Sequence, residues 1–142
     1  MTEKLSQLLR TYSQNHQNKT NKKIHKFAVP LIMFSLLGLL SLLQRGVINA
    51  AEVAILGSLI YYAQFKSLKA FMIILVQVIP MMVLIYFNPL PYWYFYLAIF
   101  VIGWMAQFLG HKIEGQRPSF FTDVQFLLIG PLWIWDLENK EP

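Results

Sequence analysis

The sequence predicts an all-α membrane protein with four transmembrane helices, an N-terminal amphipathic interfacial helix and a short bent or re-entrant C-terminal helix. Of the 142 residues, 56% are hydrophobic and 13% are charged, whereas soluble domains carry about 25% charged residues. Four apolar stretches approach the length needed to cross ~30 Å of hydrocarbon. The chain is therefore interpreted as a single membrane domain over residues 1–142. Cysteine is absent, which excludes disulfides, thiolate metal sites and cysteine nucleophiles.

Residues 2–26 are predicted to be an interfacial, polar and basic segment. One stripe of a helix with a 3.6-residue period is formed there by residues spaced four, three and four apart: Leu5, Leu9, Tyr12 and His16. The spacing predicts a helix over residues 2–16 that lies in the plane of the interface, with this stripe toward lipid or protein. The basic residues suit an anionic leaflet better than nucleic acid, because apolar segments follow at once.

Four apolar segments follow, and each is predicted to be a transmembrane helix: about 27–43, 47–65, 70–87 and 92–109. Pro30 is tolerated in the first turn of the first helix, and Pro80 should kink the third. A fifth apolar stretch, 120–135, would be only ~24 Å long as a helix. Asp123 and Gly130-Pro131 interrupt this stretch, so it is predicted to be a short, bent or re-entrant helix.

The basic residues orient the chain, because cytoplasmic loops carry an excess of Lys and Arg. With a cytoplasmic N-terminus, that side holds ten of the twelve basic residues: six before the first span, two between the second and third, and two after the fourth. The opposite loops hold Arg45 alone, and Lys140 lies in the tail. We therefore expect an integral membrane protein with both termini cytoplasmic, in the inner membrane of a bacterial host or the endoplasmic reticulum of a eukaryotic one.

All three histidines of the chain are predicted to lie at this cytoplasmic surface. His16 and His25 precede the first span and His111 ends the fourth, so an even number of crossings separates them. Imidazole is the commonest protein ligand for redox-active metals and the usual proton carrier near neutral pH. Their shared side is therefore the best indication of chemistry in the sequence.

A first group of polar residues surrounds two of these histidines. Asn21 and His25 share a helical face, and Asn18 joins it. His16 and His25 are nine residues apart, about 180° around an ideal helix, so they meet at one centre only if the chain turns between them. Asparagines favour caps and turns over helix interiors, which favours such a turn. The alternative is a hydrated juxtamembrane stretch with ordinary surface histidines.

A second group lies on one stripe of the fourth predicted span, at spacings of three, four and three: Trp104, Gln107, His111 and Glu114. Gln107 is inside the bilayer edge, where an amide needs a partner. His111 and Glu114 can approach one metal together, or Glu114 can orient the imidazole without touching the metal. The alternative is an interfacial polar cap in which Glu114 pairs with Lys112 or Arg117.

Together the two groups predict a metal site with nitrogen and oxygen ligands, which suits non-haem iron or zinc. The ligand types do not distinguish these two metals. The predicted ligands are His16, His25 and His111, with Glu114 as a fourth ligand or an orienting carboxylate. The predicted supporting residues are Asn18, Asn21, Gln107 and Asp123, the last as an outer partner or a helix cap.

The same residues resemble a known family, the yeast-type 2-hydroxy fatty acid dioxygenases, which are small integral membrane proteins. Two patterns carry the resemblance: Tyr12-x3-His16-x-Asn18-x2-Asn21-x2-Ile24-His25-x4-Pro30, and Trp104-x2-Gln107-Phe108-x-Gly110-His111-x2-Glu114-x3-Pro118 with a later Pro131. The resemblance covers nearly the whole chain. Ser119-Phe120 departs from the small and aliphatic residues expected after Pro118, which leaves the substrate chain length open.

The resemblance implies an enzyme that uses Fe(II) and O2 to convert a 2-hydroxy fatty acid into the acid one carbon shorter plus CO2, an α-oxidation. It also implies that His16, His25 and His111 are the iron ligands. The 2-hydroxy acid would chelate iron through its carboxylate and hydroxyl and leave a position for O2. We expect the acyl chain to enter from the lipid leaflet and lie among the spans. Basic residues at the interface would steer its carboxylate: Lys22, Lys23, Lys26 or Arg117.

Two other classes of protein stay open. A metal- or proton-coupled transporter places ionisable groups near the membrane midplane, but the predicted spans hold only Glu52 and scattered glutamines. A non-catalytic membrane scaffold needs no convergence of histidines. A di-iron hydroxylase or desaturase needs more than three histidines, so that class is excluded. Membrane lipids are the other expected partners, and nucleic acid is not one.

Overall fold

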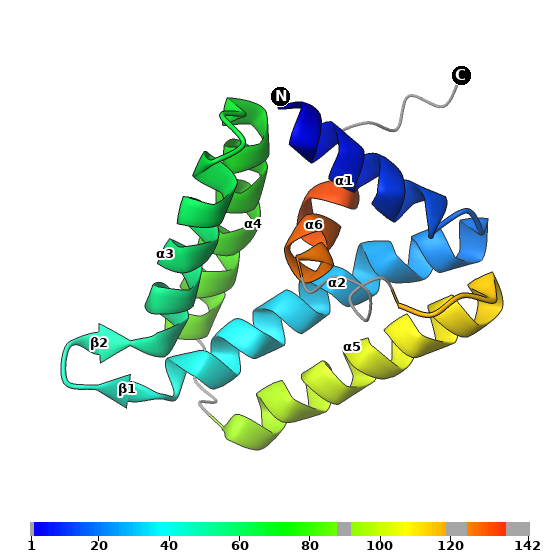
Figure 1. Ribbon diagram of the computed structural model, residues 1–142. Coiled ribbons are helices and arrows are strands. Elements are labelled where there is room, and N and C mark those ends of the chain that lie inside the picture. Colours follow the sequence, from blue (N-terminus) through cyan, green and yellow to red (C-terminus); the bar gives the residue numbers. More distant parts are fainter. Residues whose placement is uncertain (1, 88–91, 119–124, 136–142) are drawn as a thin grey trace.

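A computed structural model describes residues 2–87, 92–118 and 125–135 as a helical assembly with one small hairpin. The elements are α1 (Glu3–Gln14), α2 (Lys19–Ser41), β1 (Gln44–Arg45), β2 (Ile48–Asn49), α3 (Ala50–Ala63), α4 (Leu68–Phe87), α5 (Trp93–Glu114) and α6 (Phe126–Trp133). Helices α2 and α5 run antiparallel as one pair and α3 and α4 as another (Figure 1). Helix α1 packs against α6, which sits among the other helices.

The N-terminal helix has the predicted amphipathic pattern. Leu5, Leu9 and Tyr12 are buried on one stripe of α1, as the spacing of four and three residues requires. The helix ends at Gln14, so His16 lies beyond it in the connection to α2. His16 is nevertheless fully buried, because the chain turns inward after the helix instead of continuing the stripe.

The predicted turn between His16 and His25 is confirmed. Asn18 caps the start of α2, and its side-chain oxygen accepts hydrogen bonds from the backbone N–H groups of Thr20 and Asn21 at 2.8 and 3.3 Å. This is the role that asparagine plays at a helix N-terminus. Helix α2 then runs for 23 residues, so it begins eight residues before the apolar stretch predicted from 27. His25 therefore lies on the same rigid helix as the first span.

Three helices are long and apolar enough to cross a membrane, namely α2, α4 and α5. The second predicted span, 47–65, is shorter than expected, because the antiparallel hairpin of β1 and β2 occupies its beginning. Helix α3 has 14 residues, or ~21 Å of helix, which is less than the ~30 Å hydrocarbon core. The described chain is thus a mostly helical protein with three candidate spans, and the fourth crossing stays a prediction.

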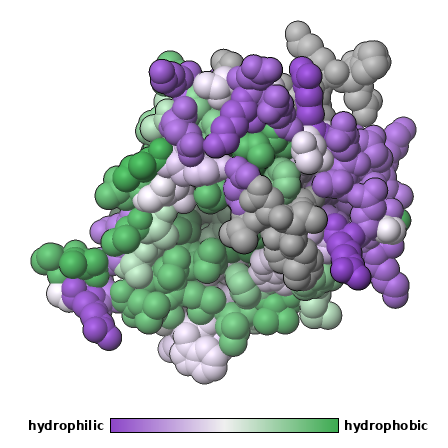
Figure 2. All heavy atoms as spheres, viewed as in Figure 1, coloured by the Kyte–Doolittle hydropathy of each residue, from purple (hydrophilic) through white to green (hydrophobic). Residues whose placement is uncertain are grey.

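The surface agrees with a lipid environment for these helices. Large apolar side chains on α4 and α5 are exposed, for example Val76, Leu84, Ile102 and Met105, and a soluble protein seldom exposes so much contiguous apolar surface. Figure 2 shows hydrophilic residues gathered at the end that carries α1, and hydrophobic residues over much of the rest of this face. That polar end is where the histidines lie.

Glycines allow α2 and α5 to approach closely. A Cβ added at any of three α2 or α5 glycines would overlap a side chain of the facing helix: Gly38 with Tyr96, Gly103 with Ile32, and Gly110 with Asn21. Small residues at such contacts are typical of helices that pack in membranes. The pair α2–α5 is therefore held in one close register, which fixes His25 opposite His111.

The predicted short C-terminal helix is confirmed as α6, an eight-residue helix containing Pro131. It is buried along most of its length. Hydrogen bonds tie it to three other helices: Trp133 Nε1 donates to Ser13 Oγ of α1 at 2.7 Å, Tyr62 Oη of α3 donates to the Leu128 carbonyl at 2.5 Å, and Gln77 Nε2 of α4 donates to the Pro131 carbonyl at 3.0 Å. These hydrogen bonds therefore join the α3–α4 pair to α1 through α6. Asp123 lies outside the described residues.

Candidate metal centre

The three histidines converge at one buried point. His16 and His25 have no exposed surface and His111 is 5% exposed. One ring nitrogen from each lies within 4.8 Å of the other two. The three rings meet edge to face, with centroids 4.4 to 4.9 Å apart. The sequence-based expectation that these residues come together is met, since the turn after α1 brings His16 to the face that α2 and α5 share.

Backbone hydrogen bonds fix the tautomers of two of the rings. His16 Nδ1 lies 2.7 Å from the Tyr12 carbonyl oxygen, and His25 Nδ1 lies 3.1 Å from the Asn21 carbonyl oxygen. A carbonyl only accepts, so each Nδ1 carries the proton and donates it. In a neutral ring the Nε2 atom then has no proton and presents a lone pair.

These two lone pairs face each other across a short distance. The Nε2 atoms of His16 and His25 are 3.1 Å apart, and two acceptors at this distance repel unless a cation or an added proton lies between them. Burial lowers the pKa of the His16 imidazole below its ordinary value, which opposes an added proton. The geometry therefore fits a bound metal ion better than a shared proton.

The third ring completes a donor set suited to a metal. His111 Nδ1 is buried and has no hydrogen-bond partner among the described residues, and such an orphaned polar atom needs an explanation such as an ion. At metal sites, the ring nitrogen of a histidine that does not bind the metal usually donates a hydrogen bond to a carbonyl or carboxylate oxygen. His16 and His25 both have such a carbonyl partner. The three histidines thus fit a cation that prefers nitrogen ligands, such as ferrous iron or zinc.

The Glu114 carboxylate binds the start of α2. Its oxygens accept hydrogen bonds from the backbone N–H of Gln17 at 2.7 Å, from that of Asn18 at 3.0 and 3.1 Å, and from the Asn21 side chain at 2.8 Å. A carboxylate is favoured at a helix N-terminus, where several N–H groups are unpaired. Glu114 therefore fastens the end of α5 to the segment between His16 and His25. No hydrogen bond joins this carboxylate to the His111 ring in the described residues, so the predicted role of Glu114 as a ligand or as the orienting partner of that imidazole stays a prediction.

Asn18 and Asn21 belong to the same connection, and their predicted supporting role at a metal site stays a prediction. Asn18 is the cap of α2, and Asn21 is fully buried between Glu114 and the α5 backbone. A Cβ added at Gly110 would occupy the place of the Asn21 side-chain oxygen. Gly110 is therefore needed for Asn21 to reach Glu114.

Aromatic residues that sequence reasoning did not assign to the site enclose it. The Tyr12 ring stacks on His16 with centroids 4.3 Å apart and planes 8° from parallel. Trp133 of α6 lies 5.0 Å from His16 and 6.3 Å from His25 between ring centroids. Tyr12 could have been found from its place four residues before His16 on the α1 stripe. Trp133 carried no comparable signal, because it is far from the histidines in the sequence.

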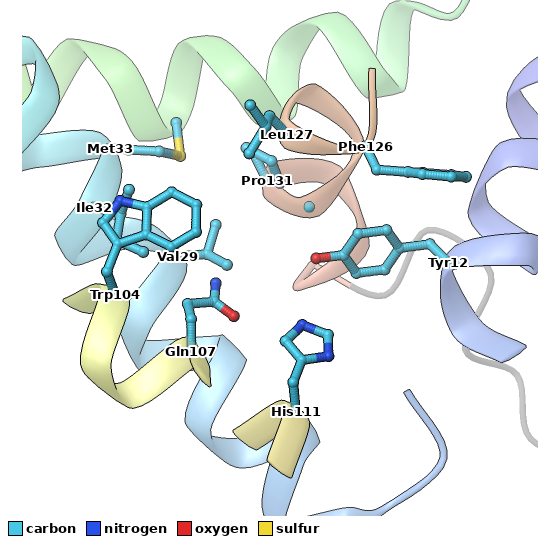
Figure 3. A pocket seen from close by; sticks show the side chains of 11 residues that line it. Tyr12, Val29, Ile32, Met33, Trp104, Gln107, His111, Phe126, Leu127 and Pro131 are labelled. Carbon is cyan, nitrogen blue, oxygen red and sulfur yellow. The ribbon is translucent and has the colours of Figure 1, made fainter. Parts of the chain in front are cut away.

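A small cavity of about 70 Å³ opens beside His111. Figure 3 shows the Tyr12 hydroxyl, the Gln107 amide and the His111 ring directed toward one space below α6. Burial raises the pKa of the Tyr12 phenol, so its hydroxyl remains a neutral donor. Gln107, predicted to need a polar partner, thus lies in the wall of a cavity that could provide one.

The predicted carboxylate-steering residues lie farther out. Lys23, Lys26 and Arg117 are exposed and Lys22 is half-buried. The described wall of the cavity beside His111 includes none of these side chains. They surround the polar end of the molecule instead, so their steering role stays a prediction.

Comparison with known proteins identifies the family. Residues 2–141 match a family model described as "2-hydroxy-palmitic acid dioxygenase Mpo1-like". The 2-hydroxy-palmitic acid dioxygenase MPO1 of Saccharomyces cerevisiae is 28% identical over 127 residues, which cover 87% of this chain and 72% of the yeast protein. No solved structure matches the chain at a significant level. The dioxygenase name of the family supports an enzymatic role, and the chain belongs to the Mpo1-like family.

Proposed function

We propose that this protein is an Fe(II)-dependent dioxygenase that shortens 2-hydroxy fatty acids by one carbon at the membrane interface. A 2-hydroxy fatty acid and O2 would give the fatty acid one carbon shorter, CO2 and water, which balances all atoms. The family match and the name of the yeast relative support the substrate class. The observation that carries the proposal is the buried group of three histidines with two opposed Nε2 lone pairs.

His16, His25 and His111 would hold the metal. When bound, iron would supply the redox chemistry through which O2 reacts with the 2-hydroxy acid. The chain itself positions these groups: the Tyr12 and Asn21 carbonyls orient two imidazoles, and Glu114 fixes the turn between them. Whether Glu114 also reaches the metal is part of the proposal, and its four hydrogen bonds to the start of α2 favour the orienting role.

The cavity residues would receive the head of the substrate. The Tyr12 hydroxyl and the Gln107 amide face the space beside His111, and both can donate a hydrogen bond to a carboxylate or hydroxyl oxygen. Tyr12 and Phe126 contact each other and both line this space, and Tyr12 also packs against Trp133 on the His16 side. These aromatic walls would exclude water from the reacting centre, which strengthens electrostatic interactions inside it.

The substrate would reach the site from the cytoplasmic leaflet. The beginning of α2 and the end of α5 lie at the same end of the molecule, where the exposed basic residues gather. The substrate carboxylate would be drawn toward that end by basic side chains: Lys22, Lys23, Lys26 and Arg117.

Because the chain has no cysteine, single introduced cysteines can test the orientation of the protein in the membrane. A cysteine at Arg45 should be labelled only from outside and one at Lys66 only from inside, and the reverse pattern would contradict the topology.

Anaerobic reconstitution with Fe(II), followed by addition of O2 and 2-hydroxypalmitate, tests the proposed activity. We expect formation of the fifteen-carbon acid and CO2 with iron and not with zinc. The His111→Ala variant, purified in parallel, should lose both bound iron and product. Purified wild-type protein that binds no metal would favour a non-catalytic scaffold, and activity that does not depend on iron would contradict the proposed cofactor.

A further inference from the structure

A second, larger cavity lies among the helices on the far side of the one beside His111. Its volume is about 510 Å³, within the ~300–1,000 Å³ range of ligand sites. Its walls come from five helices: α2, α3, α4, α5 and the buried α6. The end of the cavity that is farthest from the histidines is lined by one residue each of α2, α3 and α5: Leu40, Ala54 and Phe100.

The two cavities adjoin. Five residues line both: Ile32, Met33, Trp104, Leu127 and Pro131. Figure 3 shows these side chains on the side of the small cavity away from His111 and Tyr12. A ligand whose polar head lies beside Tyr12, Gln107 and His111 could therefore continue past Trp104 and Pro131 into the larger space.

The larger cavity suits an apolar occupant. The polar side chains in its wall already have partners within the protein. Ser58 Oγ donates to the Ala54 carbonyl at 2.9 Å and Tyr62 Oη donates to the Leu128 carbonyl, while Gln125 Oε1 accepts from Tyr61 Oη at 3.4 Å. The remaining walls are mostly leucine, isoleucine, methionine and aromatic side chains. Such walls gain dispersion contacts from a hydrocarbon that fills the space.

The length of the space matches a long acyl chain. Val29 lines the small cavity and Leu40 lines the large one, and these residues are separated by ~16 Å along the axis of α2. One leaflet of a bilayer has a hydrocarbon thickness of ~15 Å, half of the whole core. The two cavities together thus span about the length of one membrane acyl chain.

We propose that the larger cavity holds the acyl chain of the substrate inside the protein, with the methyl end near Leu40 and Ala54. This inference rests on the proposed function for the identity of the polar head. It makes Ala54, Leu40 and Phe100 the residues that set substrate chain length. Long-chain 2-hydroxy acids fill the cavity, whereas shorter ones leave its far end empty.

Photo-crosslinking locates the chain without depending on turnover. The probe is 2-hydroxypalmitate with a diazirine next to its methyl end, added to wild-type protein in nanodiscs without O2. We expect adducts at Leu40, Ala54 or Phe100, assigned to single residues by fragmentation of the labelled peptides. Excess unlabelled 2-hydroxypalmitate should suppress them. Adducts confined to lipid-facing Val53 and Leu56, with no suppression, would overturn the inference. Cavity adducts in a protein that shows no turnover would overturn the proposed function alone.

Chain-length selectivity provides a second test with a matched control. Ala54→Trp should fill the far end, so kcat/KM for 2-hydroxypalmitate should fall about tenfold or more. Activity toward 2-hydroxydecanoate should stay unchanged. The neighbouring Val53→Trp adds the same ring on the lipid-facing side, where Val53 is 57% exposed, and should alter neither rate. Equal losses for both substrates in Ala54→Trp, with Val53→Trp unaffected, would contradict a role in chain length.

Discussion

Replacing Glu114 with Gln perturbs the contact that joins α5 to the turn between His16 and His25. The carboxylate accepts hydrogen bonds from the backbone of Gln17 and Asn18 and from the Asn21 side chain. Glutamine keeps the shape and one acceptor oxygen. Its NH2 group can only donate, and it would face N–H groups that also donate, because every partner of the carboxylate is an N–H group. The variant therefore loses the negative charge and at least one of these hydrogen bonds.

The expected cost follows from these contacts. A hydrogen bond to a charged group contributes about 1.5–3 kcal/mol, and a negative charge at a helix N-terminus about 0.3–1 kcal/mol. Part of this loss should appear as a poorer placement of His16 and His25. We expect iron affinity to fall ~10–100-fold, as is typical when an outer partner of a metal ligand is removed. Activity at saturating iron should fall at least about tenfold, in line with the same principle.

Anaerobic titration of Fe(II) against a competing chelator measures the change. Glu3→Gln, which removes an exposed carboxylate from the first turn of α1, is the control and should bind iron like the wild type. The visible spectrum of the Co(II)-substituted protein separates the two roles of Glu114. An orienting residue leaves the spectrum of the saturated variant unchanged, whereas a ligand alters it. Wild-type affinity and activity in Glu114→Gln would show that this carboxylate does not hold His16 and His25 in place.

Three further outcomes are expected. Leu9→Asp should lower iron occupancy while the spans remain inserted, because Leu9 is buried on the stripe by which α1 packs against the protein. Gln7→Asp, at an exposed position, is the control. Unchanged occupancy in Leu9→Asp would mean that α1 docking does not hold His16. Gly110→Ala should displace Asn21, at an overpacking cost of about 1–3 kcal/mol, and should weaken iron binding. The control Gly57→Ala has open space around the added Cβ and should bind iron like the wild type. Equal iron affinities in the two variants would contradict a role for the Gly110–Asn21 contact. Burial lowers the His16 pKa, so below pH ~6.5 the unfolded metal-free chain gains a proton that the folded chain resists, and stability in detergent should fall with acidification through this range. His16→Asn should reduce that slope, and an unchanged slope would contradict the assignment.

Much of the helical frame could be predicted from residue spacing. The α1 stripe and the turn before α2 followed from Leu5, Leu9 and Tyr12 and from the asparagines. Hydropathy located the apolar part of α2 but not its polar first eight residues, because the start of that helix is set by the Asn18 cap and by Glu114. The shortening of α3 was not foreseen, since residues of the β1–β2 hairpin such as Val47 and Ile48 are as apolar as those of a span.

The sequence could predict which residues share one side of the membrane, but not how their side chains are arranged there. Because an even number of predicted spans separates them, His16, His25 and His111 were expected at the same membrane surface. Their orientation depends on tertiary contacts that no local pattern encodes. Glu114 reaches Gln17 across 97 residues of sequence, and Trp133 reaches Ser13 across 120. Among the many aromatic residues of a membrane chain, nothing local distinguished Trp133 from those that face lipid.

The central claim is that His16, His25 and His111 together bind one ferrous ion that supports turnover. Its most direct test measures iron content and conversion of 2-hydroxypalmitate to the fifteen-carbon acid in the wild type and in the three single His→Ala variants, each reconstituted anaerobically and matched for membrane insertion. We expect about one iron per chain in the wild type, as for a single three-histidine site, and loss of both iron and product in every variant. Full activity in any one variant would remove that histidine from the site, and full activity in two would contradict the claim.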